Sequence, residues 1–388
     1  MANQGQNPQW EGTIEEEKGI KVIKNPNEPL YGEITFDLEE DLSIGNEKDE
    51  KYMFYGGVAL TVDSGGNIFA LDRGNYRIQK YNKNGIHIQS IGRRGQGPGD
   101  FQSPGSLCTD SEGNIYVKDR RRMKTFKRDG TFKHIFSLSN FPMPWGLTKE
   151  GNILGQIAKW EPEESNKGTY DIVLVDYEGE IIKTIASFSY KNPPPIRKKV
   201  YLTALFEGLL YSCQINEQFW IYGLSSEYKL FLINTLGDLV CMIEKDEPGE
   251  PITKKEKNKE VDYWLDRVNS VHPSRRGEKY SRREIKSILK YPKHKPYFSS
   301  IYCDDSGRIY VERFKSLLDK DEKTIYDIFS REGYYLYILN LSTPIQATGT
   351  IKNGYLYRVE RDEETDYQKI KRYKIKNWEQ IKTGHNSE

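Results

Sequence analysis

Short runs of apolar residues, many with alternating polar positions, follow one another along this chain and are separated by Gly-containing turns. Residues 86–91 (IHIQSI) are one such run, and they follow the turn NKNG at residues 82–85. Alternation of apolar and polar residues is typical of β-strands, and a Gly turn between two such runs predicts a β-hairpin. The chain is therefore expected to consist mainly of β-hairpins.

The hairpins recur as a repeat. A Gly–polar–Ile–aromatic motif occurs at residues 66–69 and 113–116, and related copies at residues 151–154, 307–310 and 354–357, with a degenerate one at 215–224, bring the total to six. A second hairpin follows in most copies, and repeats of roughly 40–50 residues with four strands each are typical of propeller blades. We therefore predict an all-β, six-bladed β-propeller of four-stranded antiparallel blades, with tandem β-sandwiches as the alternative.

The sixth copy lacks an outer strand, because only residues 367–377 have strand character after its first hairpin. The segment GEITFDLEEDLSIG at residues 32–45 is a candidate for the missing strand. A strand from the chain start would close the ring and remove exposed sheet edges. We expect a flexible N-terminal segment over residues 1–19, the propeller over residues 20–378, and a flexible tail over residues 379–388.

Residues 247–296 interrupt the repeat between blades four and five. Apolar residues recur there at helical spacing, namely Val261, Trp264, Leu265, Val268 and Val271. Ser281 and Glu284 have the spacing of a capping box at the start of a second helix. We therefore expect two short helices joined by a basic loop. This insertion should lie on the face that carries the connections between successive blades, which we call the top face.

The segment DRGNYRIQKY, residues 72–81, resembles the NHL repeat, whose core combines Asp with Asn-His-Arg-Ile-Gln and an aromatic residue. This chain has Tyr76 in place of the name-giving His. Residues 91–107 (IGRRGQGPGDFQSPGSL) resemble a loop of six-bladed propeller proteins common in Bacteroidetes and related bacteria. The resemblance covers nearly all of residues 20–378 and implies the fold, not an activity. It also implies export, often as a lipoprotein, and so a periplasmic or cell-surface location.

Acid–Arg pairs stand at the ends of several predicted strands. Asp72–Arg73 is the first, and the pattern returns at residues 119–120 and 360–361, whereas Ile157 and Arg313 occupy the acid position in the third and fifth repeats. We expect the acid to accept backbone hydrogen bonds in a tight turn and the Arg to pair with a carboxylate of a neighbouring blade. Direct contact of these pairs with a ligand is the alternative.

Basic residues gather on the predicted top face, although 58 Lys and Arg nearly balance 57 Asp and Glu over the whole chain. Cations and aromatic rings that converge in a concave site suit an anionic ligand or an acidic glycan. The predicted ligand-binding residues are Arg73, Arg93, Arg94, Arg120, Arg121, Trp145, Lys159, Trp160 and Arg313.

The composition restricts the classes of function. A formal net charge of +1 provides no general field toward nucleic acid, and no apolar run reaches the roughly 18 residues of a membrane span. The 4 Cys residues form no CxxC pair and the 5 His residues have no paired-ligand spacing, so no metal site or catalytic residue is predicted. The polar start MANQGQNPQW indicates either a cytoplasmic protein or a chain that begins after a removed export signal.

These observations predict a monomeric, non-catalytic binding or scaffold module of the bacterial cell envelope. It would dock a partner protein, or an anionic or glycan ligand, on the top face. The alternative is a metal-dependent hydrolase or lyase at the channel mouth, similar to the lactonases and amidating lyases of this fold. Glu207 is the obvious acidic candidate near the inner strands. No cofactor is expected, and calcium stays open under the alternative.

Overall fold

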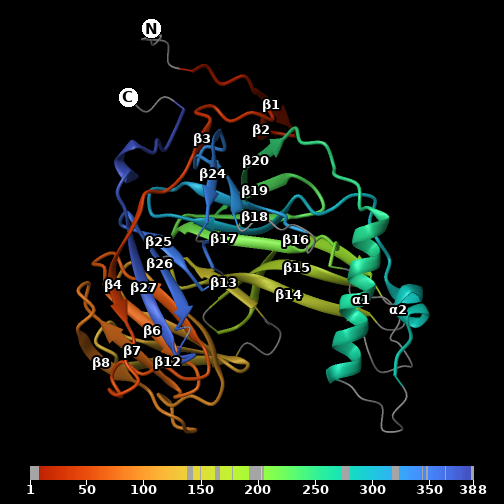
Figure 1. Cartoon of the computed structure of the whole chain (residues 1–388). Helices are drawn as coiled ribbons and strands as arrows, with labels where there is room; N and C mark the ends of the chain where they lie inside the picture. Colours follow the sequence, from red (N-terminus) through yellow and green to blue (C-terminus); the bar gives the residue numbers. More distant parts are fainter. Residues whose placement is uncertain are drawn as a thin grey trace.

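The computed structural model is a six-bladed β-propeller, as predicted (Figure 1). It describes residues 8–137, 143–148, 150–161, 167–176, 178–191, 202, 205–271, 279–316, 323–342, 344–346, 348–362 and 364–385. The inner strands of most neighbouring blades contact each other, including those of blades six and one, and blades two and three share a hydrophobic cluster that contains Tyr116 and Leu147. The ring is therefore closed.

Each blade is an antiparallel meander that runs from the channel outward. Blade one holds β5 (Val58–Val62), β6 (Ile68–Asp72), β7 (Arg77–Tyr81) and β8 (His87–Ile91). Blade two holds β9 (Pro104–Thr109), β10 (Ile115–Asp119), β11 (Arg122–Phe126) and β12 (Phe132–Ser137). Blade three holds β13 (Met143–Leu147), β14 (Ile153–Glu161), β15 (Lys167–Val175) and β16 (Ile181–Lys191).

The second half of the ring continues in the same order. Blade four holds β17 (Leu210–Asn216), β18 (Phe219–Leu224), β19 (Lys229–Asn234) and β20 (Leu239–Lys245). Blade five holds β21 (Phe298–Cys303), β22 (Ile309–Arg313), β23 (Thr324–Phe329) and β24 (Tyr335–Leu341). Blade six holds β25 (Thr350–Lys352), β26 (Tyr355–Arg361) and β27 (Gln368–Ile375).

The repeated Gly motif forms the turn between the first two strands of a blade. In blade one, the amide of Gly66 donates to the carbonyl of Asp63, and the Asp63 side chain accepts hydrogen bonds from the backbone and the amide group of Asn67. Gly66 has φ +81°, a left-handed conformation that costs other residues more than glycine. The same contacts join Asp110 to Asn114 in blade two. This geometry explains why the motif returns.

The N-terminal segment follows the outer edges of three blades in turn, as the red trace in Figure 1 shows. β1 (Thr13–Glu17) and β2 (Ile20–Asn25) extend blade four, and β3 (Glu33–Ile34) pairs with the outer strand of blade five. β4 (Leu38–Ile44) then pairs antiparallel with β27 as the fourth strand of blade six. The predicted closing strand is confirmed, whereas residues 13–17, expected to be flexible, form a strand.

The C-terminal segment also packs onto the propeller. After the 3-10 helix η1 (Trp378–Gln380), the backbone carbonyls of Gly384 and His385 accept hydrogen bonds from the hydroxyl of Tyr31. The ring of His385 stacks on that of Tyr334, with 4.1 Å between the ring centroids. The tail expected to be flexible is therefore held against blade five as far as residue 385.

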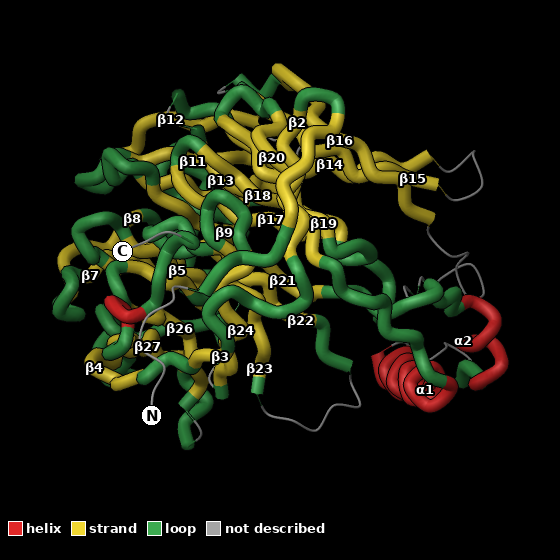
Figure 2. Tube along the Cα trace, turned by 90° about the horizontal axis from the view of Figure 1, so that it is seen from above, coloured by secondary structure: helices red, strands yellow, loops and turns green. Residues whose placement is uncertain are grey.

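The insertion between blades four and five forms α1 (Lys254–Val271) and α2 (Arg282–Ile288), which stand apart from the ring in Figure 2. The Ser281–Glu284 capping box is present in both directions. The predicted apolar stripe packs inside the insertion, where Val261 and Val268 are buried against α2 and Leu202. Leu202 belongs to the connection between blades three and four, so the helices lie on the top face. The basic loop expected between them falls on residues 272–278, outside the described residues.

Candidate functional site

The strand-end acids of blades one and two hold the backbone together. Asp72 accepts hydrogen bonds from the backbone amide of Tyr55 at 2.9 Å and from the side chains of Asn75 and Arg77. Asp119 accepts hydrogen bonds from the amides of two residues ahead of β9, Gln102 and Ser103. Both carboxylates thus fasten the chain that enters the inner strand to the end of the second strand. The expected backbone role of the acid agrees with these contacts.

An ion pair between the second and third strands recurs in several blades, but the strand that carries the acid differs from blade to blade. Blade two has the acid on its second strand, where Asp119 lies 3.0 Å from Lys124. Blades three and five have the base there: Lys159 pairs with Asp171 at 2.5 Å, and Arg313 with Asp327 at 2.7 Å. Two predicted ligand residues, Lys159 and Arg313, are therefore engaged by carboxylates of their own blades.

The Arg of the first strand-end pair lines a cavity of about 650 Å³ at the top of the junction between blades six and one. We call it the mouth cavity. Blade one contributes Gly57, Val58 and Arg73; the second and third strands of blade six and the connection before it contribute the remainder, which are Gln346, Thr348, Arg358, Val359, Glu360, Arg361, Gln368 and Tyr373.

Three buried polar atoms in the mouth cavity lack a hydrogen-bond partner: Nε of Arg73, Nε of Arg358 and Oε1 of Gln368. Such atoms are uncommon in folded proteins, since each loses its hydration without replacement. Elsewhere in the described part of the chain, only Trp220 and Glu260 carry one. The expected pairing of Arg73 with a neighbouring carboxylate is thus not seen at its Nε, while Arg361 pairs with Asp366 in its own turn at 2.9 Å.

The remaining polar groups of the mouth cavity fix the orientation of Arg358. Its Nη1 donates to Glu360 at 2.8 Å, and Gln346 can accept from its Nη2 at 3.1 Å once the amide is turned. Tyr373 donates to the same carboxylate at 2.8 Å. Burial and the nearby Glu360 raise the pKa of Tyr373, which keeps its hydroxyl protonated. Arg358 is therefore held in a fixed orientation while its buried Nε has no partner.

An exposed aromatic ring lies beside the mouth cavity. Tyr55 is 67% exposed, and it precedes the cavity-lining Gly57 by two residues. Its ring packs over Gly74, where a Cβ atom would come within 2.4 Å of the Tyr55 carbonyl oxygen. Glycine is thus required for this close approach. An exposed ring with an apolar face and a polar tip is a typical contact surface for ligands.

A second hollow of about 540 Å³, which we call the arginine cavity, lies over blade two on the same face. It is lined by Gln96, Gln102, Asp119, Arg120, Arg121, Arg122, Lys124 and Ser137. The three consecutive arginines are exposed, and no ion pair within the described residues involves them. Arg120 has φ +57°, and this left-handed residue makes the tight turn between β10 and β11. Arg120 and Arg121 therefore both line this cavity.

The loop between blades one and two carries Arg93 and Arg94, and its Gln96 lines the arginine cavity. Arg93 is 84% exposed and pairs with Asp100 at 3.1 Å. The Arg94 guanidinium lies 5.2 Å from the ring centroid of Tyr76, in the same turn as Arg73. The loop therefore connects the mouth cavity to the arginine cavity. Trp145 and Trp160 lie in β13 and β14, but their side chains fall outside the described residues.

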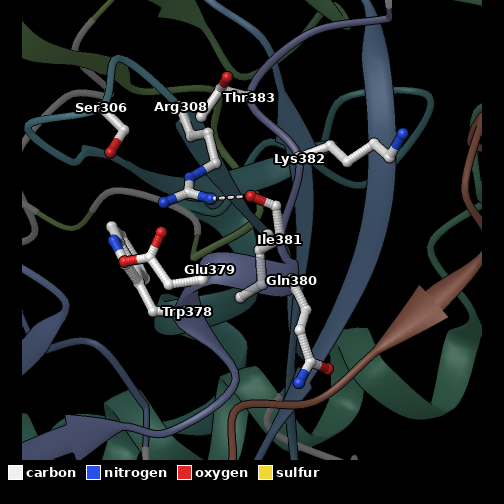
Figure 3. Close-up of a pocket in the computed structure, with 8 residues that line it drawn as sticks. All are labelled: Ser306, Arg308, Trp378, Glu379, Gln380, Ile381, Lys382 and Thr383. Carbon is white, nitrogen blue, oxygen red and sulfur yellow. Dashed lines mark hydrogen bonds between the residues drawn. The ribbon is translucent and has the colours of Figure 1, made fainter. Parts of the chain in front are cut away.

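A hollow of about 470 Å³ on the opposite face shows the contrast with the mouth cavity (Figure 3). It is lined by Ser306, Arg308 and the C-terminal residues 378–383. Arg308 donates to Asp304 at 2.7 Å and to the carbonyl of Ile381 at 2.6 Å, and it lies 3.9 Å from the Trp378 ring centroid. These contacts hold the C-terminal segment in place, so we assign this hollow a structural role.

The described residues contain no cluster of three or more His, Cys, Asp and Glu side chains that could hold a metal ion. Burial raises the pKa of Glu207, the acidic candidate of the enzyme alternative. Sequence reasoning missed Arg358, Gln368 and Tyr55. For Arg358, the sequence does contain an indication of its role, because a charged residue stands there between the apolar Tyr357 and Val359 of a predicted strand.

Comparisons with known proteins give matches at the level of the fold. No family model matches the chain, and no curated protein matches its sequence. A putative exported protein from Bacteroides fragilis superposes with a TM-score of 0.53 and 13% identity, over 91% of this chain and 100% of that one. A member of the DUF4221 family from Bacteroides vulgatus reaches 0.48 at 9% identity, over 88% and 99% of the two chains. Virginiamycin B lyase from Staphylococcus aureus reaches 0.40 at 12% identity, over 87% and 99%.

These similarities concern the fold, because all identities are far below those at which function is shared. Within the described ranges, no helix has the length and apolar character needed to cross a bilayer. The chain is a six-bladed β-propeller, consistent with an NHL-like propeller family.

Proposed function

We propose that this propeller is a non-catalytic binding module of the cell envelope, and that its mouth cavity binds an acidic sugar. The observation that carries the proposal is the set of three unpartnered buried polar atoms, on Arg73, Arg358 and Gln368, in one cavity. Location in the envelope is supported by the match to a protein described as a putative exported protein, whose whole length the chain covers.

The chemistry of the unpartnered atoms selects the ligand. The Nε edge of an arginine binds a carboxylate through two parallel hydrogen bonds, so Arg73 and Arg358 call for anionic oxygens. The unpartnered oxygen of Gln368 calls for a donor, which a hydroxyl group provides. Tyr55 adds an apolar surface beside the cavity. A sugar acid carries all three features, since it has a carboxylate, hydroxyl groups and a ring with an apolar face.

Ligand entry requires a small adjustment of the cavity. The two Nε atoms and the Gln368 oxygen are closed to solvent. A ligand that reaches them must therefore shift side chains at the entrance, and Arg361 is 62% exposed there. The gain comes from pairing groups whose desolvation has already been paid in the folded protein, worth about 1–3 kcal/mol for each group.

Titration calorimetry with galacturonic acid tests the proposal. The wild-type protein should bind it, and Arg73→Gln should weaken binding by about tenfold or more, which corresponds to the loss of one charge-assisted contact. Arg331→Gln is the matched control, because Arg331 is 53% exposed in the hairpin turn after β23, on the opposite face, and pairs only with its neighbour Glu332 among the ion pairs of the described residues. Equal affinity of wild type and Arg73→Gln, or no binding by either, would refute the proposal.

A further inference from the structure

The arginine cavity is the strongest feature that the proposed function leaves unused. Three arginines in a row, Arg120–Arg122, stand exposed over blade two without a carboxylate partner in the described part of the chain. Their acidic neighbour Asp119 is buried and already holds Lys124 and two backbone amides. Adjacent like charges repel one another, and an anion that binds between them relieves that repulsion.

One contact links the segments that line the two cavities. Arg73 in the mouth cavity and Tyr76 belong to one turn of blade one, and Arg94 lies on the Tyr76 ring. Two residues after Arg94, Gln96 already lines the arginine cavity. With at most about 3.5 Å for each residue of extended chain, residues 73–76 span about 10 Å or less and residues 94–96 about 7 Å or less, on either side of the Arg94–Tyr76 contact.

Along this path the acidic residues are engaged locally. Asp100 pairs with Arg93 and also accepts a hydrogen bond from the amide of Gly97, and this backbone contact together with Arg93 lowers the pKa of Asp100. Asp366 pairs with Arg361. The surface between the cavities therefore keeps an excess of positive charge on Arg94 and on Arg120–Arg122.

From this arrangement we infer that the top face binds one strand of an acidic polysaccharide, with sugar acids of the same strand in the mouth cavity and the arginine cavity. The inference rests on the proposed function, because the mouth cavity supplies the first subsite. A chain that fills both subsites gains affinity over a single sugar, since the second contact is then intramolecular. Repeating carboxylates along a chain also match a row of arginines better than a single compact anion does.

The test compares galacturonic acid with its linear hexamer by titration calorimetry at low and at physiological salt. The wild-type protein should bind the hexamer at least tenfold more tightly than the monomer. The double variant Arg120→Gln, Arg121→Gln should lose this advantage and keep monomer affinity within about twofold. The control variant Lys127→Gln, Arg128→Gln removes the same charge from the hairpin at the other end of blade two, where both residues are exposed, and should bind both ligands as wild type does.

The outcomes separate the two proposals. Monomer binding that depends on Arg73, without any gain for the hexamer, would overturn the polysaccharide inference and leave the proposed function standing. Equal effects of the two double variants would also overturn it, because general charge would then explain the gain. Poly-glutamate that binds as tightly as the hexamer through the same arginines would assign the face to an acidic protein instead. Absence of binding by either sugar would defeat the proposed function, and the inference with it.

Discussion

Asp327 is the centre of a buried charge network between blades four and five, and its replacement by Asn is predicted to be severely destabilising. Its Oδ1 accepts hydrogen bonds from Nε and Nη2 of Arg313 at 3.0 and 2.7 Å and from the hydroxyl of Tyr335 at 2.6 Å. Its Oδ2 accepts from Tyr228 and, at 3.1 Å, from Lys245. The side chains of Lys245 and Asp327 are both 0% exposed.

The magnitude follows from this burial. Asn keeps the shape of Asp but removes the buried charge that Lys245 and Arg313 share, and Lys245 then keeps only the partly exposed Glu247 at 2.6 Å as a counter-charge. Breaking a buried pair in this way costs about 3–5 kcal/mol. Lys245→Met should cost less, about 1–3 kcal/mol, because Asp327 keeps Arg313 and both tyrosine hydroxyls. Asp238→Asn is the matched control. Asp238 pairs with Lys183 on the surface, where the two side chains are 55% and 40% exposed, and such pairs contribute about 0–1 kcal/mol.

Urea unfolding followed by far-UV circular dichroism measures these differences. Burial by itself would raise the pKa of Asp327, but Lys245 and Arg313 outweigh it and the pKa lies below the usual 3.8. The charged Asp327 carboxylate therefore stabilises the folded state fully above pH 3.8, and this contribution is lost as the pH falls through the lower pKa of the folded protein. The gap between wild type and Asp327→Asn should narrow in acid. A loss below about 1 kcal/mol at pH 7, or a gap that does not depend on pH, would refute this account.

Three further predictions test the folding of the insertion, the turns and the closing strand. Burial raises the pKa of Glu260 above 4.5, so the free energy of unfolding of the wild type should fall relative to that of Glu260→Gln as the pH rises through the folded pKa. Urea unfolding at pH 5 and pH 8 measures this, and the same difference between the two proteins at both pH values would contradict it. Gly113→Ala should lower the free energy of unfolding by about 1–2 kcal/mol, because Gly113 has φ +83°. The loss should be slightly smaller for Gly151→Ala, because a Cβ atom there meets no atom within 4 Å, and thermal unfolding of both variants compares them. Ile44→Ala in β4 should lower the free energy of unfolding by about 2–4 kcal/mol, and Ile14→Ala in β1 by less than 1 kcal/mol, because Ile44 is buried and Ile14 is half-exposed. Urea unfolding measures both losses, and equal losses would refute the role of β4 as the closing strand.

The sequence was sufficient for the blades because their local signals agree with one another. The Asp–Gly–Asn turn of blade one, the alternating strands and the capping box at Ser281 each specify structure through contacts between residues close in the chain. The paths of residues 13–34 and 379–385 were not predicted. β2 and β3 pair with strands of blades four and five, which follow in sequence by some two to three hundred residues, and no local pattern specifies such a partner.

The candidate site was predicted in part for the same reason. Repetition drew attention to Arg73 and Arg120, whose positions return from blade to blade. Arg358 and Gln368 stand outside that repetition, and they become part of a site only because blade six meets blade one. Lys159 and Arg313 satisfied the pattern of a top-face cation, but carboxylates on the neighbouring strands engage them. Sequence position thus gave the location of a charge and not its partner.

The closing strand explains why the unpartnered groups gather at this junction. In blade two, the acid on the second strand is 3.0 Å from the lysine on the third. The equivalent pair in blade six is Glu360 and Lys371, but β4 brings in Glu40, and Lys371 lies 2.8 Å from Glu40 and 3.9 Å from Glu360. Glu360 is then free to hold Arg358 through Nη1, which leaves Nε unpaired beside the channel mouth. Closure of the ring by the N-terminal segment therefore completes the fold and also engages Lys371, so that Glu360 orients Arg358 in the cavity that we propose as the binding site.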